Sequence, residues 1–395
     1  MKLAFVVQRY GADVAGGSES HCRELARHLS SRHDITVITT CARDYITWRN
    51  QYAPGESVDG AARVLRFPVA RRRDLDRFAE LSDEVFDGGA PRQVQEAWFR
   101  ANGPDAPALL EYLARHGRDY DLVLFWTFRY APSYFGVPLV RDRAVLVPTA
   151  EEDPAISLDV LEEFFRQPAG FLFMTPEEQA LVCARAGRLL APSAVVGTGL
   201  DPAAHEASGA EVLRRHGIDG EYALYLGRVD RNKGCDTLLE YFRVYAAARD
   251  APTLVLAGPQ AMQVPPHPRI RATGYVSEEL REALLANARV LVVPSRYESL
   301  SIVLLEAWNH GVPALVNGRC RVLQGQVRRA GGGLYYRSAA EFVDALDWLL
   351  TRADLRDALG RQGRAYVDRE YRWPTVVERV ERLLAEVAAR TSRRF

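Results

Sequence analysis

The chain has 395 residues, which is too long for one compact core and fits two or three domains of roughly 150 residues each. Hydrophobic residues make up 48% of it and charged residues 26%, with 29 Gly and 21 Pro, so the composition excludes a disordered chain, a collagen-like repeat and a disulfide scaffold. Lys plus Arg and Asp plus Glu number 51 each. Because proteins that bind nucleic acid carry a basic excess, we expect no nucleic-acid partner.

The first half of the chain alternates short apolar runs with amphipathic helical patterns. The expected strands are 3–7, 35–40, 64–68, 122–126, 144–147 and 171–174. The expected helices are 18–31, 74–86, 107–117 and 176–187. Strands that are apolar throughout and separated by helices predict a parallel sheet covered on both faces.

The same alternation restarts in the second half. The expected strands are 222–229, 253–257, 290–294 and 313–316, and the expected helices are 236–249, 277–288, 301–310 and 339–351. The last helix is preceded by Ser338-Ala-Ala-Glu341, a capping box. The segment 195–202, rich in Gly and Pro, is typical of a hinge. We therefore expect two doubly wound α/β domains, 1–196 and 197–374.

A further helical pattern runs from Pro374 to about Ala389, with Pro at a plausible first helical position. Its apolar residues recur at helical spacing and must be covered by another part of the protein. They are Val376, Val377, Val380, Leu383, Leu384 and Val387.

The cysteines and the amino terminus indicate a cytoplasmic protein. The cysteines are odd in number and lie in no metal-ligand spacing, which favours buried free thiols in a reducing compartment. The apolar run 3–7 is too short for a signal peptide, and no stretch approaches the ~20 apolar residues that span a bilayer. We expect no transmembrane segment and leave open a peripheral contact with the inner face of a membrane; the oligomeric state cannot be read from the sequence.

The most informative stretch is 294–307, where a strand ends at Pro294, a turn carries Glu298 and a helix begins near Ser299 to Ser301. In open α/β sheets, ligands bind beyond the carboxyl ends of the strands, and helix N-termini offer N–H groups to anions. Glu306 lies inside this helix among apolar neighbours and needs a partner, because an unpaired buried charge is costly. The alternative is a helix-surface glutamate or a capping ion pair.

A second stretch, 225–234, places two cations directly after a strand. Arg228 and Lys233 are flanked by Gly227 and Gly234, which allow close backbone approach. Two cations at such a position suit a diphosphate; the alternative is a solvated basic loop.

The exit of the first strand, 11–18, carries Gly16-Gly17 before a helix. It is not the GxGxxG pattern, and no acidic residue ends a second strand at the usual distance. A nicotinamide Rossmann site is therefore disfavoured.

Together these residues resemble the retaining glycosyltransferases of family 4, which have the two-domain GT-B fold. Glu298 and Glu306, separated by seven residues, match the paired-glutamate motif of that family. Three further segments match its phosphate-binding segment, its N-terminal glycine loop and its base-contacting segment: Gly227-Arg228 with Lys233-Gly234, Gly16-Gly17, and Gly274-Tyr275-Val276 followed by Ser277-Glu278-Glu279-Leu280. The likeness covers nearly the whole chain and is strongest from 222 to 336.

The resemblance implies that the second domain binds a nucleotide-diphosphate sugar, with UDP or GDP as the first expectation, and that the first domain binds the acceptor. Arg228 and Lys233 would neutralise the diphosphate as charge develops on the leaving group. Glu298 would hold the sugar hydroxyls, and Glu306 the ribose hydroxyls. The last helix, about 375–395, would cross back onto the first domain. The resemblance also implies donor-binding roles for Gly16, Gly17, Gly227, Gly258, Tyr275, Val276, Ser299, Leu300 and Ser301.

Two departures from the family pattern bear on the chemistry. Ser299-Leu300-Ser301 stands where the family has glycine and an aromatic residue, so contacts to the sugar are expected to differ. The segment 147–154 lacks the family's histidine, and Glu151 takes its place. Glu151 would accept a hydrogen bond from a sugar hydroxyl or act as a base toward the acceptor; the alternative is a loop acid.

The resemblance implies transfer of a hexose-type sugar, with retention, to a hydroxyl of a glycan, glycolipid or small glycoside. Without an obvious carboxylate nucleophile, we expect front-face attack, with Arg228, Lys233, Glu298 and Glu151 as the catalytic candidates. We expect neither a cofactor nor a metal, since no DxD pattern stands at a strand end and the cations would stabilise the diphosphate. The alternatives are a GT-B epimerase, hydrolase or phosphorylase, and a non-catalytic nucleotide-sugar-binding protein.

The loops 41–62 and 86–107 of the first domain are long and carry aromatic side chains that either stack on sugar rings or pack beneath the loops. These are Tyr45, Trp48, Tyr52, Trp98 and Phe99.

Overall fold

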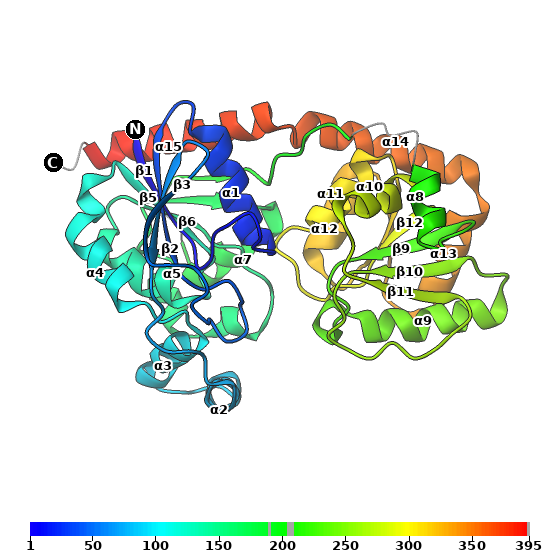
Figure 1. Ribbon diagram of the computed structural model, residues 1–395, viewed down its shortest axis with the longest axis horizontal. Helices are drawn as coiled ribbons and strands as arrows, with labels where there is room; N and C mark the ends of the chain where they lie inside the picture. Colours follow the sequence, from blue (N-terminus) through cyan, green and yellow to red (C-terminus); the bar gives the residue numbers. More distant parts are fainter. Residues whose placement is uncertain (189–190, 204–208, 393–395) are drawn as a thin grey trace. The chain divides into compact units, whose positions relative to one another are not determined.

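The computed structural model describes residues 1–188, 191–203 and 209–392, and it divides the chain into two compact units (Figure 1). The first unit is Met1–Thr198 together with Val376–Phe395, and the second is Gly199–Thr375. Each unit is a sheet with helices packed against it, as the alternation of apolar runs and helical patterns predicts.

The first unit contains an eight-stranded sheet in the order β3-β4-β2-β1-β5-β6-β7-β8. All neighbouring strands are parallel except β3 and β4, which are antiparallel at the edge. The strands are β1 (Lys2–Val6), β2 (Asp34–Thr40), β3 (Gly55–Asp59), β4 (Ala62–Phe67), β5 (Leu122–Trp126), β6 (Ala144–Val147), β7 (Gly170–Phe173) and β8 (Ser193–Val195).

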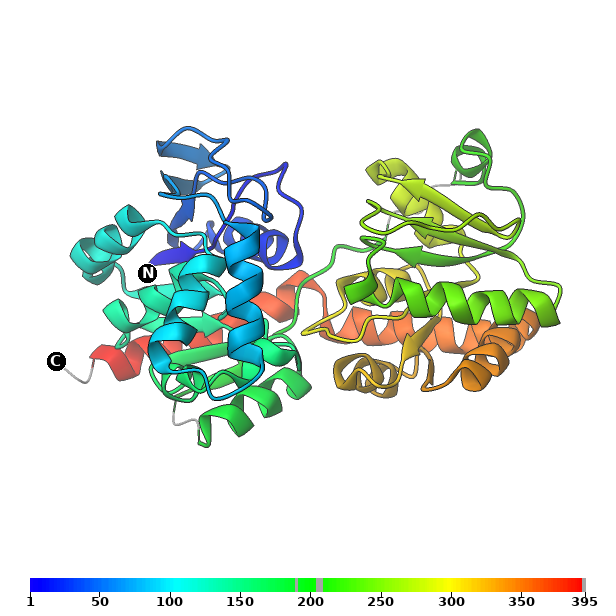
Figure 2. The ribbon, with the colours of Figure 1, turned by 90° about the horizontal axis from the view of Figure 1, so that it is seen from below.

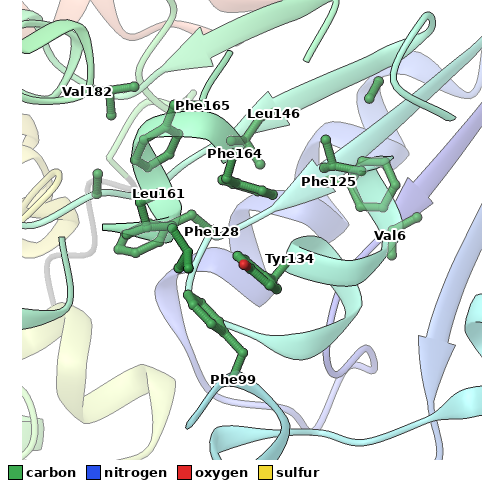
Figure 3. Close-up of a cluster of buried hydrophobic side chains, with 14 of the residues drawn as sticks. Val6, Phe99, Phe125, Phe128, Tyr134, Leu146, Leu161, Phe164, Phe165 and Val182 are labelled. Carbon is green, nitrogen blue, oxygen red and sulfur yellow. The ribbon is translucent and has the colours of Figure 1, made fainter. Parts of the chain in front are cut away.

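Helices of the first unit bury apolar side chains against this sheet. Phe99 stacks on Tyr134 with ring centroids 3.9 Å apart, and Tyr134 also stacks on Phe164, so three helices meet in one cluster (Figure 3). The helices are α1 (Gly17–Leu29), α2 (Leu75–Phe86), α3 (Arg92–Asn102), α4 (Pro107–His116), α5 (Ala131–Gly136), α6 (Val160–Phe164) and α7 (Pro176–Ala186). Short 3₁₀ turns are η1 (Gly117–Asp119), η2 (Val137–Val140) and η3 (Pro154–Ser157).

The second unit contains a six-stranded parallel sheet in the order β11-β10-β9-β12-β13-β14. Its strands are β9 (Tyr222–Leu226), β10 (Thr253–Ala257), β11 (Ile270–Gly274), β12 (Val290–Val293), β13 (Ala314–Asn317) and β14 (Gly333–Tyr336). Its helices are α8 (Gly209–Arg215), α9 (Cys235–Ala248), α10 (Glu278–Asn287), α11 (Ile302–Asn309), α12 (Arg321–Ala330), α13 (Ala339–Thr351) and α14 (Ala353–Glu370), with the 3₁₀ turn η4 (Arg231–Lys233). The two doubly wound domains expected from the sequence are therefore present.

Two of the elements that the sequence did not predict, β3 and α14, lack a strong apolar pattern. The edge strand β3 buries none of its side chains, and its Val58 is exposed. The helix α14 is largely polar and contains Gly360, where any side chain would overlap the carbonyl oxygen of Gly311. Close backbone packing of this kind leaves no periodic signal in the sequence. The other missed elements are β8, β11, β14, α3, α5, α6, α8 and α12.

The capping box before α13 takes a modified form. The hydroxyl of Ser338 accepts a hydrogen bond from the Glu341 N–H at 3.3 Å, as predicted. The Glu341 carboxylate, however, accepts from the N–H of Arg337 at 2.6 Å.

The expectation of five buried thiols was wrong in one position, because Cys183 is half-buried while the other four free cysteines are buried.

The last helix, α15 (Trp373–Ser392), confirms the expected crossing back to the first unit (Figure 1, Figure 2). It begins in the second unit, and its residues from Val376 belong to the first. All six apolar residues of the predicted stripe are at most 7% exposed. A side chain at Gly170 of β7 would lie 2.5 Å from Val387, so the stripe is covered by the first sheet. In the part of the chain that the structure describes, no helix combines the length and the apolarity needed to cross a membrane.

We predict that Leu384→Ala lowers the stability of the first unit by about 2–5 kcal/mol, because Leu384 is fully buried and its loss leaves a cavity. The measurement is urea denaturation followed by tryptophan fluorescence. The matched control is Arg382→Ala on the exposed face of α15, which should change stability by about 0.5 kcal/mol or less. Equal effects of the two substitutions would contradict the packing of this helix.

Candidate functional site

The carboxyl edge of the second sheet gathers the residues that the sequence singles out. Because β9 and β12 are adjacent parallel strands, the loops that follow them leave the sheet at the same edge. The loop after β9 carries Arg228 and Lys233, and the loop after β12 carries Glu298. Residues far apart in the sequence thus meet here.

Lys233 and Glu298 form an ion pair, with Lys233 Nζ 2.9 Å from Glu298 Oε1. The Glu298 side chain is 13% exposed and that of Lys233 is 36% exposed, so the pair is only partly screened by water. Arg228 has a carboxylate beside it as well, with its Nε 2.8 Å from Asp230 Oδ2. The structure therefore brings together three of the predicted catalytic candidates on two adjacent loops.

Glycines let the backbones of these loops pack without side chains between them. Gly258 follows β10 with φ +141°, and a side chain there would overlap the carbonyl oxygen of Gly227. Gly234 has φ +76°, and a side chain there would overlap the carbonyl oxygen of Pro294. Only glycine fits both the conformation and the space, so the loops pack backbone against backbone at this edge.

The N-terminus of α11 lies directly after Glu298. The helix begins at Ile302, slightly later than predicted, and Ser301 takes the N-cap position without capping the helix through its side chain. Within the described residues, the buried Ser301 Oγ has no hydrogen-bond partner. The Ser301 N–H donates to Oε1 of the buried Gln326 at 3.1 Å, which fixes the turn. A helix N-terminus with a free hydroxyl suits an anion.

The two remaining residues of this turn contribute differently. Leu300 is buried, so it can offer a ligand only its backbone, whereas Ser299 is half-buried. The Ser-Leu-Ser sequence therefore presents hydroxyl groups and backbone at the start of α11.

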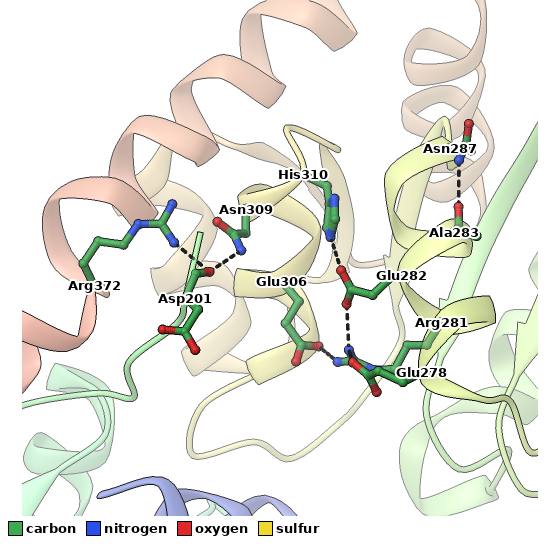
Figure 4. A network of polar contacts seen from close by, with 10 residues as sticks. All are labelled: Asp201, Glu278, Arg281, Glu282, Ala283, Asn287, Glu306, Asn309, His310 and Arg372. Carbon is green, nitrogen blue, oxygen red and sulfur yellow. Dashed lines mark hydrogen bonds and ion pairs between the residues drawn. The ribbon is translucent and has the colours of Figure 1, made fainter. Parts of the chain in front are cut away.

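Glu306 has the partner that the sequence demanded, and that partner is Arg281 of α10 (Figure 4). Burial raises the pKa of Glu306, and the guanidinium of Arg281 opposes this rise. Sequence reasoning missed Arg281 because it lies 25 residues earlier, in a helix with many charged residues. The only signal was the need of a buried carboxylate for a cation.

Tyr275 and Val276 follow β11 at the same edge of the sheet. Tyr275 is 84% exposed, and Val276 is half-buried. The next residue, Ser277, caps α10 by accepting a hydrogen bond from the Leu280 N–H at 3.2 Å. The cap fixes the backbone after Tyr275 and leaves its ring available for a ligand.

In the first unit, Gly16 and Gly17 form the entry to α1 after β1. A side chain at Gly16 would overlap the carboxylate of Glu19, so only glycine fits. Glu19 and Arg9 form a buried ion pair with a closest distance of 2.5 Å. Arg9 also donates to the carbonyl oxygen of Ala15 at 3.0 Å, which ties the glycine loop to the strand end. Sequence reasoning missed both Arg9 and Glu19; an acid in the first helical turn was the available signal.

Glu151 is half-buried after β6, in a segment held by a second buried carboxylate. Thr149 has the unusual φ of +46°, and the Ala150 N–H donates to Glu178 Oε1 at 2.7 Å. Glu178 also accepts from the Met174 N–H at 2.5 Å. Burial raises the pKa of Glu178 to about 8, although these N–H groups lower it. Glu178, which the sequence did not reveal, thus positions the backbone beside Glu151.

The aromatic side chains of the two long loops mostly serve packing. Trp48, Trp98 and Phe99 are at most 2% exposed, so the alternative of sugar stacking is wrong for these three. Tyr45 is exposed with the Arg9 guanidinium 5.4 Å from its ring, and Tyr52 is half-buried under Arg66.

Across residues 1–188, 191–203 and 209–392, no three or more His, Cys, Asp or Glu side chains gather in a way that could hold a metal ion.

Residues 220–352 match the family described as glycosyl transferases group 1. Among curated proteins, the chain is 28% identical over 171 residues to the alpha-D-kanosaminyltransferase of Streptomyces kanamyceticus, covering 39% of this chain and 43% of that protein. It is also 28% identical over 159 residues to the mannosylfructose-phosphate synthase of Agrobacterium fabrum, covering 36% of this chain and 33% of that protein. The matches thus span less than half of these relatives.

Solved structures resemble the whole chain in fold. The sucrose-phosphate synthase from Thermosynechococcus elongatus aligns with a TM-score of 0.74 at 18% identity, covering 98% of this chain and 99% of that chain. A trehalose-6-phosphate synthase from E. coli bound with UDP-2-fluoro glucose aligns with a TM-score of 0.73 at 13% identity, with coverage of 98% and 99%. HepE of Anabaena, in complex with UDP and glucose, aligns with a TM-score of 0.69 at 14% identity, covering 98% of this chain and 100% of that chain.

These likenesses define the fold class: two parallel-sheet Rossmann-like domains, as in structures of the GT-B fold. The segment that matches the glycosyl transferases group 1 family, 220–352, contains every donor-site candidate of the second unit.

We predict that Gly258→Ala destabilises the second unit more than Gly311→Ala does. Both glycines have positive φ, and strain of this kind costs about 1–3 kcal/mol. Only at Gly258 would the added methyl group also overlap backbone, while Gly311 has open space around it. Thermal denaturation of the two variants measures the difference, and equal losses would contradict the close packing of the loops after β9 and β10.

We predict that Glu178→Gln destabilises the first unit by about 1–3 kcal/mol at pH 5, because the amide places an NH₂ group against a backbone N–H that loses its acceptor. The raised pKa means that the folded protein keeps a proton which the unfolded chain has lost. The retained proton stabilises the folded state. This stabilisation is fully present below the usual glutamate pKa and is lost as the pH rises through about 8. The cost of the substitution should therefore shrink between pH 5 and pH 8. Urea denaturation of both proteins measures it, with exposed Glu84→Gln as control; a cost that grows with pH would contradict the account.

Proposed function

We propose that the protein is a retaining glycosyltransferase of family 4 that moves a hexose-type sugar from a nucleotide-diphosphate sugar to a hydroxyl acceptor. The observation that carries the proposal is the Lys233–Glu298 ion pair beside the uncapped N-terminus of α11. It combines a cation for a leaving diphosphate, a carboxylate for sugar hydroxyls and N–H groups for an anion, all within the segment that matches the glycosyl transferases group 1 family.

In this proposal, Arg228 and Lys233 stabilise the negative charge that develops on the departing diphosphate. The Ser301 hydroxyl and the first N–H groups of α11 bind the phosphate oxygens. Glu298 accepts hydrogen bonds from the sugar hydroxyls. The close backbone packing at Gly234 and Gly258 and the ion pairs of Arg228 and Lys233 already fix these groups. Little reorganisation is therefore needed when the donor binds.

Glu306 accepts hydrogen bonds from the ribose hydroxyls, and Tyr275 with Val276 contacts the base. UDP is the first nucleotide to test, because UDP or a UDP-sugar is bound in HepE and in the trehalose-6-phosphate synthase that share the fold. GDP is the second. The sugar and the acceptor are left to experiment, since the curated relatives carry different names and are matched over less than half their length.

The transfer itself proceeds with front-face attack. The bond between the anomeric carbon and the diphosphate oxygen breaks, the acceptor oxygen bonds to that carbon on the same face, and the acceptor proton passes to the departing oxygen. Positive charge from Arg228, Lys233 and the α11 N-terminus takes the place of a divalent metal. Glu151, held by the backbone that Glu178 fixes, accepts a hydrogen bond from a sugar hydroxyl; the alternative is that Glu151, instead of the departing oxygen, takes the acceptor proton.

A thermal-shift screen against UDP, GDP, ADP, CMP and dTDP tests the donor class. A nucleotide at 100 times its dissociation constant should add about 2.7 kcal/mol of stability. We expect a clear shift with one base, which Lys233→Ala and Arg228→Ala each reduce. Arg269→Ala is the matched control, because Arg269 is exposed before β11, at the opposite edge of the sheet. No shift with any nucleotide would overturn the proposal.

The stereochemistry is measured by proton NMR of the product formed from an α-linked donor. We expect an α-linked product, and loss of about 10²–10³ in kcat when Glu298 is replaced by Gln, by analogy with the removal of one preorganised transition-state contact. A β-linked product would contradict retention. Release of nucleotide without any acceptor would favour the epimerase or hydrolase alternative, and nucleotide binding without any turnover would favour a binding protein.

A further inference from the structure

The guanidinium of Arg281, on α10, lies among three carboxylates (Figure 4). Its Nη1 is 3.1 Å from Glu278 Oε1 and 3.2 Å from Glu282 Oε1, and its Nη2 forms a close ion pair with Glu306 Oε2. The Arg281 side chain is 24% exposed, whereas that of Glu278 is 77% exposed. The pair with Glu306 is therefore the most protected of the three and depends least on solvent.

This arrangement leaves the two oxygens of Glu306 in different states. Oε2 is held by Arg281, whereas Oε1 accepts no hydrogen bond from the residues that the structure describes. The Glu306 side chain is 19% exposed, so a ligand at the carboxyl edge of the sheet can reach it. Oε2 thus fixes the position of the Glu306 carboxylate, and Oε1 can accept hydrogen bonds from a ligand.

The charges around Glu306 determine whether it stays a carboxylate. Burial and the nearby carboxylates of Glu282 and Glu278 raise its pKa, while Arg281 lowers it. The His310 ring faces Glu282 at 3.0 Å, whereas the His310 N–H donates to the backbone carbonyl oxygen of Glu306 at 3.2 Å. Arg281 is therefore the cation that opposes this rise and favours the ionised form of Glu306. An ionised carboxylate only accepts hydrogen bonds, which suits a pair of sugar hydroxyls that both donate.

We propose that Arg281 is a positioning residue of the donor site, which fixes Glu306 in one orientation with Oε1 presented to the ribose hydroxyls of the nucleotide. Recognition of ribose over a deoxygenated sugar then depends on Arg281 as much as on Glu306. This inference rests on the proposed function, in which Glu306 binds the ribose.

Arg281 is not needed to hold α10 in place. The helix is capped by Ser277, its residues Leu280, Leu284 and Leu285 are buried, and Glu282 is paired with His310 on α11. Arg281→Gln should therefore leave the fold intact; it removes the more exposed pairs with Glu278 and Glu282 together with the protected pair with Glu306.

The experiment is calorimetric titration of the full chain with UDP or GDP, whichever the wild-type protein binds, and with its 2′,3′-dideoxy counterpart. For Arg281→Gln we expect about a tenfold loss of affinity for the ribonucleotide and little change for the dideoxynucleotide, because a hydrogen bond to a charged group is lost. Glu306→Gln should show the same pattern, and the double variant should lose no more than either single one. Arg215→Gln is the matched control, since its exposed ion pair with Glu279 also involves α10.

The pH dependence separates positioning from a general structural effect. Removal of Arg281 takes away the influence that lowers the pKa of Glu306, so the loss of ribonucleotide affinity should grow as the pH falls from 8 to 5.5. Arg281→Lys should recover part of the affinity at low pH, because it restores a cation. Circular dichroism checks the fold, and if Arg281→Gln does not fold, Arg281→Lys and Glu306→Gln carry the comparison.

Equal losses for the two nucleotides, or no loss in Arg281→Gln, would overturn the assignment of Arg281 while leaving the proposed function in place. A wild-type protein that binds no nucleoside diphosphate would overturn the proposed function and this inference with it.

Discussion

A parallel sheet places the carboxyl ends of all its strands at one edge, and the candidate donor site depends on this constraint. In the second unit it brings the loop after β9 beside the loop after β12, so that Lys233 meets Glu298 across 65 residues of sequence. The same edge receives Tyr275 after β11 and the N-terminus of α11. The first unit repeats the arrangement by itself, with the glycine loop after β1 and Glu151 after β6.

Charged side chains at and near these edges are held in place by ion pairs. A buried or half-buried ion is costly alone, and three ion pairs avoid this cost: Arg9 with Glu19, Lys233 with Glu298, and Arg281 with Glu306. The partners also fix orientation, as Glu178 does for the backbone near Glu151. Glycines complete the arrangement, because the close contact between Gly227 and Gly258 leaves no room for side chains. The chain thus presents rigid backbone and oriented charges.

Sequence reasoning reached the elements whose signal is local. The strands β5, β6 and β10 and the helix α13 occupy the predicted residues, because apolar runs and helical periodicity are written along the chain. The positions of Arg228 and Glu298 in loops that follow strands were predicted for the same reason. Arg281, Glu178 and the Arg9–Glu19 pair were missed, since each acts through a partner on another element and looks like an ordinary surface charge in the sequence. The polar helix α14 and the exposed strand β3 were missed because they bury little.

The central claim is that the carboxyl edge of the second sheet binds the diphosphate of a nucleotide sugar. The most direct measurement is a crystal structure of the protein with a nucleoside diphosphate. The account predicts that the phosphates lie at the N-terminus of α11, in hydrogen-bond contact with Ser301, with Arg228 and Lys233 beside them and the ribose against Glu306. A nucleotide bound elsewhere, with the N-terminus of α11 and both cations free of it, would contradict the account.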